Sequence, residues 1–302
     1  MLVGTYDSLL VAASLFVAIL ASYTALDMVG RVVLVQRAMR WCWLLGGACA
    51  MGVGIWSMHF IGMLAFKLPI ALAYDIEITV LSLLAAVLTS LFALWLVTRP
   101  TLPHLRLAAG AVLMGFGIAA MHYIGMAALQ MIPGIDYRPG WLALSIVVAI
   151  TASWSALWIA FRLRLSTQRP YRRVAAAVVM GLAIVGMHYT GMAAARFPEG
   201  SICGAAQALG TSGHMGVQSL ALLVTGVTVG ILGVVLLLSL LDGRRESELL
   251  RLHTTALAAS LDTAHAELSH AALHDPLTRL PNRRLLLQRL EHAIGDAERS
   301  NS

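Results

Sequence analysis

Long apolar stretches limit the fold of this chain more than any other feature of its sequence. Seven of them reach roughly 20 residues, the length that a helix needs to cross the hydrocarbon core of a bilayer. These stretches are residues 8–29, 41–66, 77–98, 106–132, 141–161, 173–196 and 218–241. Only 12% of the 302 residues are charged, about half of the fraction in typical soluble domains. The sequence therefore predicts an all-α polytopic membrane protein with seven transmembrane helices.

The loops between these stretches differ sharply in positive charge. Three alternate loops carry ten arginines: Arg31, Arg37, Arg40, Arg99, Arg106, Arg162, Arg164, Arg169, Arg172 and Arg173. The other loops carry only Lys67, Arg138 and Arg196. Positive residues concentrate in cytoplasmic loops, so we expect the N-terminus outside and the C-terminus inside. The net charge of +6 then reflects membrane topology, and we expect membrane lipid and no nucleic acid as a partner.

A short pattern occurs three times in the apolar stretches. It reads MGVGIWSMHFIGM at 51–63, MGFGIAAMHYIGM at 114–126 and MGLAIVGMHYTGM at 180–192. Its histidines lie 63 and 66 residues apart, which predicts three helical-hairpin repeats followed by a seventh span. A proline after each pattern, Pro69, Pro133 or Pro198, is expected to stop its helix at the outer surface. His59 would then lie about 15 Å from that surface, ten residues before Pro69.

Each repeat places a glycine, a histidine and a methionine on one face of its helix. In the first repeat this face contains Gly52, Ile55, His59, Gly62 and Met63. The equivalent faces contain Gly115, Ile118, His122, Gly125 and Met126, and Gly181, Ile184, His188, Gly191 and Met192. The histidine and the methionine four residues later stack on one stripe. The glycines let neighbouring helices approach closely or leave room for a small ligand.

This stripe is a candidate metal site. Imidazole suits copper, zinc and iron, whereas thioether sulfur selects Cu(I), so copper is the expected cofactor and haem a less favoured one. The candidate ligands are His59, Met63, His122, Met126, His188 and Met192, with Met58, Met121 and Met187 as further sulfur donors. Tyr123 and Tyr189 could bond to a bound ligand or orient a histidine. Gly62, Gly125 and Gly191 lie beside them.

Other interpretations of the repeat stay open. Methionine fills gaps between helices, and an intramembrane histidine can bond to a backbone carbonyl. An ionisable group at the same depth in three repeats nevertheless favours a functional site. Two of the histidines could ligate haem, or the chain could conduct copper through Met51, Met114 and Met180, two turns deeper. In the longest outer loop, 197–217, Cys203, His214 and Met215 could receive a metal ion before it reaches the bundle.

The repeated motif resembles that of the MHYT family of bacterial integral-membrane sensor domains. The motif stands as Met58-His59-Phe60-Ile61, Met121-His122-Tyr123-Ile124 and Met187-His188-Tyr189-Thr190, and the resemblance covers residues 1–241. It implies seven transmembrane helices in the bacterial inner membrane and a copper site formed by the motif histidines and methionines. It also implies sensing of a diatomic gas such as O2, NO or CO. Phe60 replaces the tyrosine of the family motif, so this repeat lacks a hydroxyl group there.

The composition changes after residue 241. Residues 242–273 are charged, rich in alanine and free of proline, which predicts a cytoplasmic helix, either a dimeric coiled coil or a plain linker. Residues 274–302 begin with HDPLTRLPNRRLLLQRL.

That stretch resembles the start of a GGDEF diguanylate cyclase domain, with matches at Asp275, Leu277, Thr278, Leu280, Asn282 and Arg283. The resemblance implies a truncated output domain, from a longer parent that makes or degrades cyclic di-GMP. We therefore expect three segments, 1–241, 242–273 and 274–302, a homodimer formed through the last two, and no catalytic residues within this chain.

Overall fold

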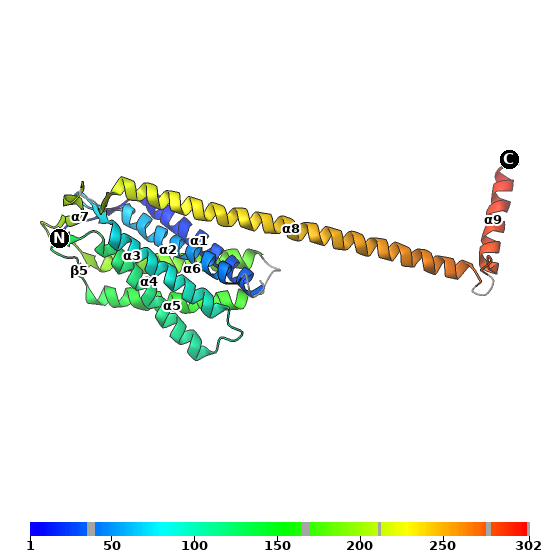
Figure 1. The fold of residues 1–302 in the computed structure, drawn as a ribbon, viewed down its shortest axis with the longest axis horizontal. Coiled ribbons are helices and arrows are strands. Elements are labelled where there is room, and N and C mark those ends of the chain that lie inside the picture. Colours follow the sequence, from blue (N-terminus) through cyan, green and yellow to red (C-terminus); the bar gives the residue numbers. More distant parts are fainter. Residues whose placement is uncertain (35–39, 165–169, 211–212, 276–278, 301–302) are drawn as a thin grey trace. The chain divides into compact units, whose positions relative to one another are not determined.

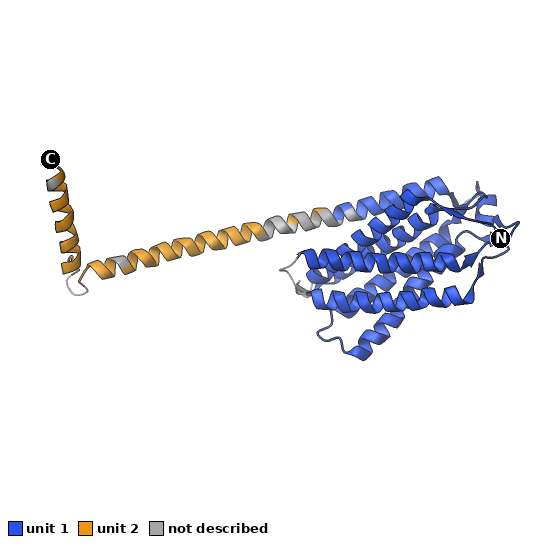
Figure 2. Cartoon of the chain, turned by 180° about the vertical axis from the view of Figure 1, so that it is seen from behind, with its two compact units in different colours: residues 1–236 blue, residues 237–302 orange. Residues whose placement is uncertain are grey.

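The computed structural model describes residues 1–34, 40–164, 170–210, 213–275 and 279–300. It divides the chain into two compact units, Met1–Leu236 and Leu237–Ser302 (Figure 2). Four residues named above, Arg37, Arg169, Leu277 and Thr278, lie outside the described ranges. The predicted segment boundaries remain predictions.

Six long helices form most of the first unit (Figure 1). They are α1 (Ser8–Leu34), α2 (Arg40–Ala65), α3 (Ile76–Val97), α4 (His104–Ala127), α5 (Pro139–Leu163) and α6 (Pro170–Ala194). Among the described residues, these six are long and apolar enough to cross a membrane, and a shorter apolar segment follows at Val217–Ile231. That segment opens α8 (Val217–Leu273) and corresponds to the seventh predicted span. The all-α polytopic membrane fold is thus confirmed.

The six helices pack as a closed ring in chain order, with α6 returning to α1. The motif helices α2, α4 and α6 alternate with α1, α3 and α5. A Cβ atom added to the first glycine of each motif would lie 2.7 Å from the neighbouring helix, in the pairs Gly52–Val87, Gly115–Ile150 and Gly181–Ile19. The same contact therefore occurs in three helix pairs, α2 with α3, α4 with α5, and α6 with α1. The bundle consequently has approximate threefold symmetry. The first helix completes the last repeat.

Short antiparallel strands connect the helices at one end of the bundle. The pairs are β1 (Thr5–Tyr6) with β2 (Phe66–Lys67), β3 (Ala73–Asp75) with β8 (His214–Gly216), β4 (Met131–Ile132) with β7 (Ile202–Cys203), and β5 (Asp136–Tyr137) with β6 (Ala195–Arg196). A one-turn helix, α7 (Gly204–Gln207), follows β7.

The motif helices end several residues before the prolines at which the sequence predicted them to stop. The helices stop at Ala65, Ala127 and Ala194, because the chain turns into β2, β4 and β6 before it reaches each proline. The fourth predicted span, 106–132, is shortened for the same reason. His59 consequently lies only about 9 Å from the end of its helix, at 1.5 Å per residue.

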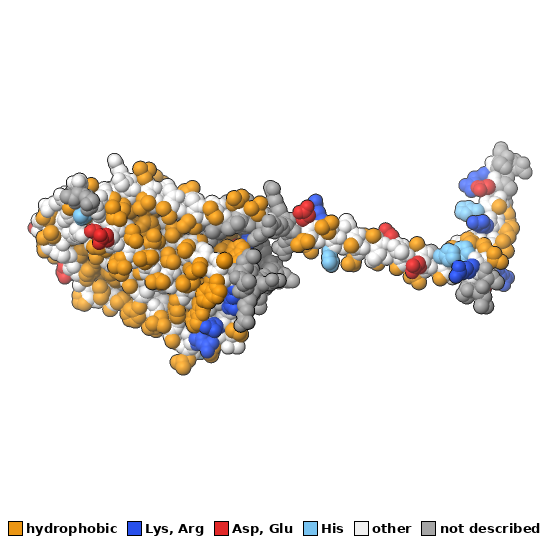
Figure 3. Space-filling model, viewed as in Figure 1, with side chains coloured by type: hydrophobic (Ala, Val, Ile, Leu, Met, Phe, Trp, Pro, Cys, Tyr) orange, Lys and Arg blue, Asp and Glu red, His pale blue; other side chains and the backbone are white. Residues whose placement is uncertain are grey.

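The surface of the first unit is apolar, as expected for a protein that faces lipid. Figure 3 shows one face on which hydrophobic side chains cover the helices, while Lys and Arg side chains gather toward one end. Phe16, Leu88 and Leu113 are among the exposed large apolar residues. At the arginine-rich end, Arg164 donates to the backbone carbonyls of Val97 and Pro100. Buried positions between the helices instead carry alanine, serine, methionine and histidine.

The second unit contains the rest of α8 and α9 (Arg283–Ser300). Asn282 starts α9, since its side-chain oxygen accepts from the amides of Arg284 and Leu285 at 3.0 and 3.1 Å. Its side-chain amide also donates to the carbonyl of Ala272 at 2.8 Å. The asparagine of the tail motif therefore anchors the turn between the two helices.

Candidate metal centre

The three motif histidines meet inside the bundle. Their Nδ1 atoms lie 3.1 Å apart for His59 and His188, 3.1 Å for His59 and His122, and 3.3 Å for His122 and His188. The ring planes are nearly perpendicular to one another, at 79° to 86°. All three side chains are fully buried. One imidazole from each motif helix therefore converges on the approximate threefold axis.

This geometry fits a bound metal ion. Three nitrogen atoms at these separations lie about 1.8 Å from the centre of their triangle, which is close to the ~2.0–2.1 Å typical of zinc–imidazole bonds. Three neutral imidazoles cannot satisfy one another here, because each nitrogen either donates one proton or presents one lone pair. A cation between three lone pairs resolves that conflict. The rings lie too close together to admit a porphyrin between them, which disfavours the haem alternative.

The motif glycines receive the far edges of these rings. A Cβ atom on Gly125 would lie 2.3 Å from Nε2 of His59, on Gly191 2.4 Å from that of His122, and on Gly62 2.3 Å from that of His188. Each histidine therefore packs on the glycine of another motif helix, in a cycle around the axis. The sequence predicted glycines at the site, and the structure shows that their partner is a histidine from a different repeat.

The Nε2 atoms have no hydrogen-bond partner. One glycine of another motif helix packs against this edge of each ring, so packing holds the orientation of each imidazole. The Nδ1 atom of each histidine therefore faces the approximate threefold axis, where the three Nδ1 atoms meet.

The motif methionines are buried, but their role as ligands stays a prediction. The six side chains are Met58, Met63, Met121, Met126, Met187 and Met192, and none is more than 4% exposed. They belong to the apolar core between the helices. Among the described His, Cys, Asp and Glu side chains, the histidine triad is the group of three that could share an ion.

The third motif position supplies an aromatic ring beside each histidine. The ring centroids of Phe60, Tyr123 and Tyr189 lie 4.9, 4.8 and 4.8 Å from those of their histidines, edge to face. The tyrosine hydroxyls point to other helices. Tyr123 donates to Ser145 at 2.7 Å, and Tyr189 donates to Ser14 at 3.1 Å. These hydroxyls thus link neighbouring helices, and a role in binding a ligand stays a prediction.

A second aromatic layer comes from the strands. Tyr74, Tyr137 and Tyr6 lie edge to face with Phe60, Tyr123 and Tyr189, at centroid distances of 5.8, 5.3 and 5.6 Å. Burial raises the pKa of Tyr6 and of Tyr137 to about 12, so both rings stay neutral. The two layers separate the triad from the strand end of the bundle.

Sequence reasoning missed the residues on the other three helices that complete this arrangement. Tyr6, Tyr74 and Tyr137 each directly precede the first turn of α1, α3 or α5. Ser14, Ser82 and Ser145 each donate to a carbonyl three residues earlier. The sequence signal was a second repeat, in which a tyrosine just before α1, α3 or α5 is followed eight residues later by a serine in that helix. The stronger motif of the other helices concealed it.

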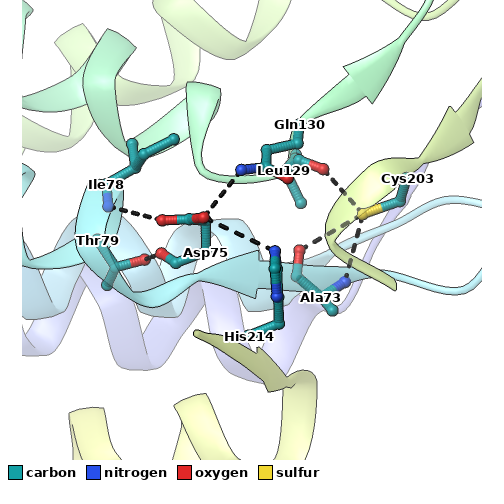
Figure 4. Close-up of polar contacts among 8 residues, drawn as sticks. All are labelled: Ala73, Asp75, Ile78, Thr79, Leu129, Gln130, Cys203 and His214. Carbon is teal, nitrogen blue, oxygen red and sulfur yellow. Dashed lines mark hydrogen bonds and ion pairs between the residues drawn. The ribbon is translucent and has the colours of Figure 1, made fainter. Parts of the chain in front are cut away.

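The loop at 197–217 contributes a separate polar cluster, drawn in Figure 4. Asp75 caps α3 by accepting from the amide of Ile78 at 2.9 Å, and it accepts from Gln130 at 2.8 Å. His214 lies 3.7 Å from the same carboxylate. The cluster joins this loop to the start of α3.

Cys203 makes a second connection between the loop and the bundle. Its thiol donates to the carbonyl of Leu129 at 2.9 Å, and it accepts from the amide of Ala73 at 3.5 Å (Figure 4). Met215 pairs with Tyr74 in the strands. These contacts hold the loop to β3 and the end of α4, and a role in receiving a metal ion stays a prediction.

The sequence pattern of MHYT, described as a bacterial signalling protein N-terminal repeat, matches residues 52–110, 115–171 and 181–253. The chain belongs to the MHYT family. The expected resemblance is confirmed, and this MHYT chain is a multi-pass protein of the bacterial inner membrane.

Similar proteins are longer than this MHYT chain. It is 58% identical over 304 residues to the bifunctional diguanylate cyclase/cyclic di-GMP phosphodiesterase MucR of Pseudomonas aeruginosa, covering 100% of this chain and 43% of that protein. It is 39% identical over 288 residues to the cyclic di-GMP phosphodiesterase NbdA of the same organism, covering 92% and 35%. The signaling protein YkoW of Bacillus subtilis is 39% identical over 196 residues, covering 64% and 24%. The chain thus spans less than half the length of these relatives. No solved structure matches it.

Proposed function

We propose that this chain is the membrane sensor module of a longer signalling protein that controls the turnover of cyclic di-GMP. The histidine triad holds a copper ion, and the module responds to O2, NO or CO, or to redox state. The convergence of three buried Nδ1 atoms on one point supports this proposal most directly. Its link to cyclic di-GMP rests on the relatives that carry such activities.

The chain's own residues favour a transition-metal ion such as copper over magnesium or calcium. The three imidazoles would hold the ion, and carboxylates are absent from the described group at the triad. Copper, when bound, supplies a coordination position for a diatomic ligand. The two aromatic layers and the apolar core exclude bulk water from the triad.

Each histidine is positioned to couple ligand binding to helix packing. His59, His122 and His188 come from three helices, and each ring touches the glycine of another repeat. A shift of one ring therefore changes the contact between two helices. A ligand biases such an equilibrium only through different affinities for the two packings.

The output passes through α8 in this proposal, with the N-terminus outside and the arginine-rich loops in the cytoplasm. Leu250, Leu257, Leu261 and Leu268 are exposed in the single chain, and their spacing of seven, four and seven residues is that of a coiled-coil seam. We expect this seam to pair with a second copy of the chain. The pairing would bring two output domains together.

The test compares copper content in purified protein. The variant with His59→Ala, His122→Ala and His188→Ala should lose the copper that wild-type protein binds at about one ion per chain. His265→Ala in α8, which changes an exposed histidine, serves as the control and should retain copper. Elemental analysis after gentle purification measures the ratio. Equal copper content in the triple variant and the wild type would refute the proposal.

A further inference from the structure

An apolar cavity of about 30 Å³ lies between the helices, on the side of the triad away from the strands. Ile55, Ile118 and Ile184, one turn before the histidines, form part of its wall, and Met51, Met114 and Met180 lie a further turn away. The same three methionines line a second cavity of about 20 Å³. The methionine side chains are therefore a shared wall between two small spaces.

Small residues on two of the alternating helices leave this space open. Ala21 of α1 and Ala152 of α5 line the larger cavity. The equivalent position of α3 carries Thr89, whose side chain packs against Gly117, and α3 contributes no residue to the described lining of the cavity. The cavity consequently lies off the threefold axis, next to α6.

The wall of the cavity is almost wholly apolar. Two buried serines, Ser22 and Ser153, belong to the lining, and they are 2% and 1% exposed. The rest of the wall is alanine, isoleucine and methionine. Walls of this kind accept small apolar molecules such as xenon.

We infer that this cavity is a docking site for a small apolar gas molecule on its way to the histidine triad. The inference rests on the proposed function, since it assigns the place where the sensed ligand waits. Ile55 precedes His59 by one helical turn, about 6 Å along the axis, so a docked molecule lies close to the metal centre. Apolar gases dissolve in the bilayer, which supplies the cavity, and the flexible methionine side chains can adjust around an occupant.

The first experiment uses xenon as the probe. Crystals of the full chain under xenon pressure should show anomalous density between Ile55, Ile118 and Met180. Ala152→Leu should remove that density, because the added side chain occupies the space. The neighbouring Thr151→Leu, an exposed substitution on the same helix, should leave it unchanged. An empty cavity under xenon, or a water molecule bonded to Ser22 and Ser153 that xenon does not displace, would overturn the inference.

A second measurement connects the cavity to the metal. The association rate of carbon monoxide with copper(I)-loaded protein should fall about tenfold in Ala152→Leu, while copper content and the Thr151→Leu rate stay at wild-type values. An unchanged rate in Ala152→Leu would also overturn the inference. Failure of the proposed function looks different, since the triple histidine variant and the wild type would then have equal copper content whether or not xenon binds.

Discussion

The histidine layer and the methionine layer come from the same three helices, two turns apart, yet they pack in different ways. In the histidine layer each side chain rests on a glycine, and three nitrogen atoms approach within 3.3 Å. In the methionine layer Met51, Met114 and Met180 border two cavities. The histidine side chains thus converge on one point, whereas the methionine side chains leave small cavities beside them.

The difference shows that threefold repetition alone does not decide what a layer can bind. A rigid ring fitted against backbone defines a fixed distance between donor atoms, which suits an ion. Flexible thioethers beside alanine and serine define a volume, which suits a neutral molecule. The motif supplies the histidines, glycines and methionines, and the neighbouring helices supply the alanines and serines beside the methionines.

The largest expected effect comes from filling the space on which a histidine rests. Gly125→Ala places a Cβ atom 2.3 Å from Nε2 of His59, so the ring must move out of the triad. We expect a loss of about 1–3 kcal/mol in stability and at least a tenfold loss in copper affinity. Thermal unfolding in detergent and copper titration measure the two effects.

Gly186→Ala is the matched control for this substitution. Gly186 lies in α6 near the motif, and an added Cβ atom would meet nothing within 4 Å. Alanine also favours a helix over glycine by up to ~1 kcal/mol, so this variant should be at least as stable as the wild type. If both variants unfold and bind copper alike, the closed packing of the histidine layer is wrong.

A smaller effect on stability is expected from two serines of α3, one beside each layer. Ser82 accepts from the indole of Trp56 at 3.0 Å, whereas Ser90, two turns along α3, is buried without a hydrogen-bond partner. Ser82→Ala should cost about 1 kcal/mol, and Ser90→Ala should be neutral or slightly stabilising. Comparing the two melting temperatures tests this contrast. A larger loss for Ser90→Ala would indicate that its hydroxyl has a partner in the protein, such as an ordered water molecule.

The smallest effect is expected from the contact between Lys67 and Asp7, which belongs to neither layer. The hydrogen bond from Lys67 is the largest cause, and the one from the amide of Leu10 the next largest, of a pKa of Asp7 below its ordinary value of 3.8. A carboxylate whose pKa is lowered by folding stabilises the protein above its unfolded pKa, and this contribution is lost as pH falls through the lowered value.

Lys67→Met should therefore reduce the melting temperature slightly at neutral pH, with no difference left in strong acid. Because both groups face solvent, salt should weaken the effect as well. A difference between the variant and the wild type that persists unchanged below pH 3 or so would contradict this assignment.

Much of this molecule follows from periodicity along single segments. The apolar stretches predicted the helices, and the repeated motif placed His59, His122 and His188 at equivalent depths. The helix ends were predicted less well, since pairing of β2, β4 and β6 with distant strands replaced the helix before each proline. Strand pairing of that kind depends on partners that a local pattern does not contain.

The sequence by itself determined which residues share one face of each helix, because helical geometry relates neighbours a few positions apart. Only the tertiary structure decided that His59 rests on Gly125, that α1 completes the third repeat, and that Ala152 borders a cavity whereas Thr89 packs against Gly117. These contacts join segments far apart in the chain. Their geometry follows from how whole helices pack, and that packing is a property of all six helices together.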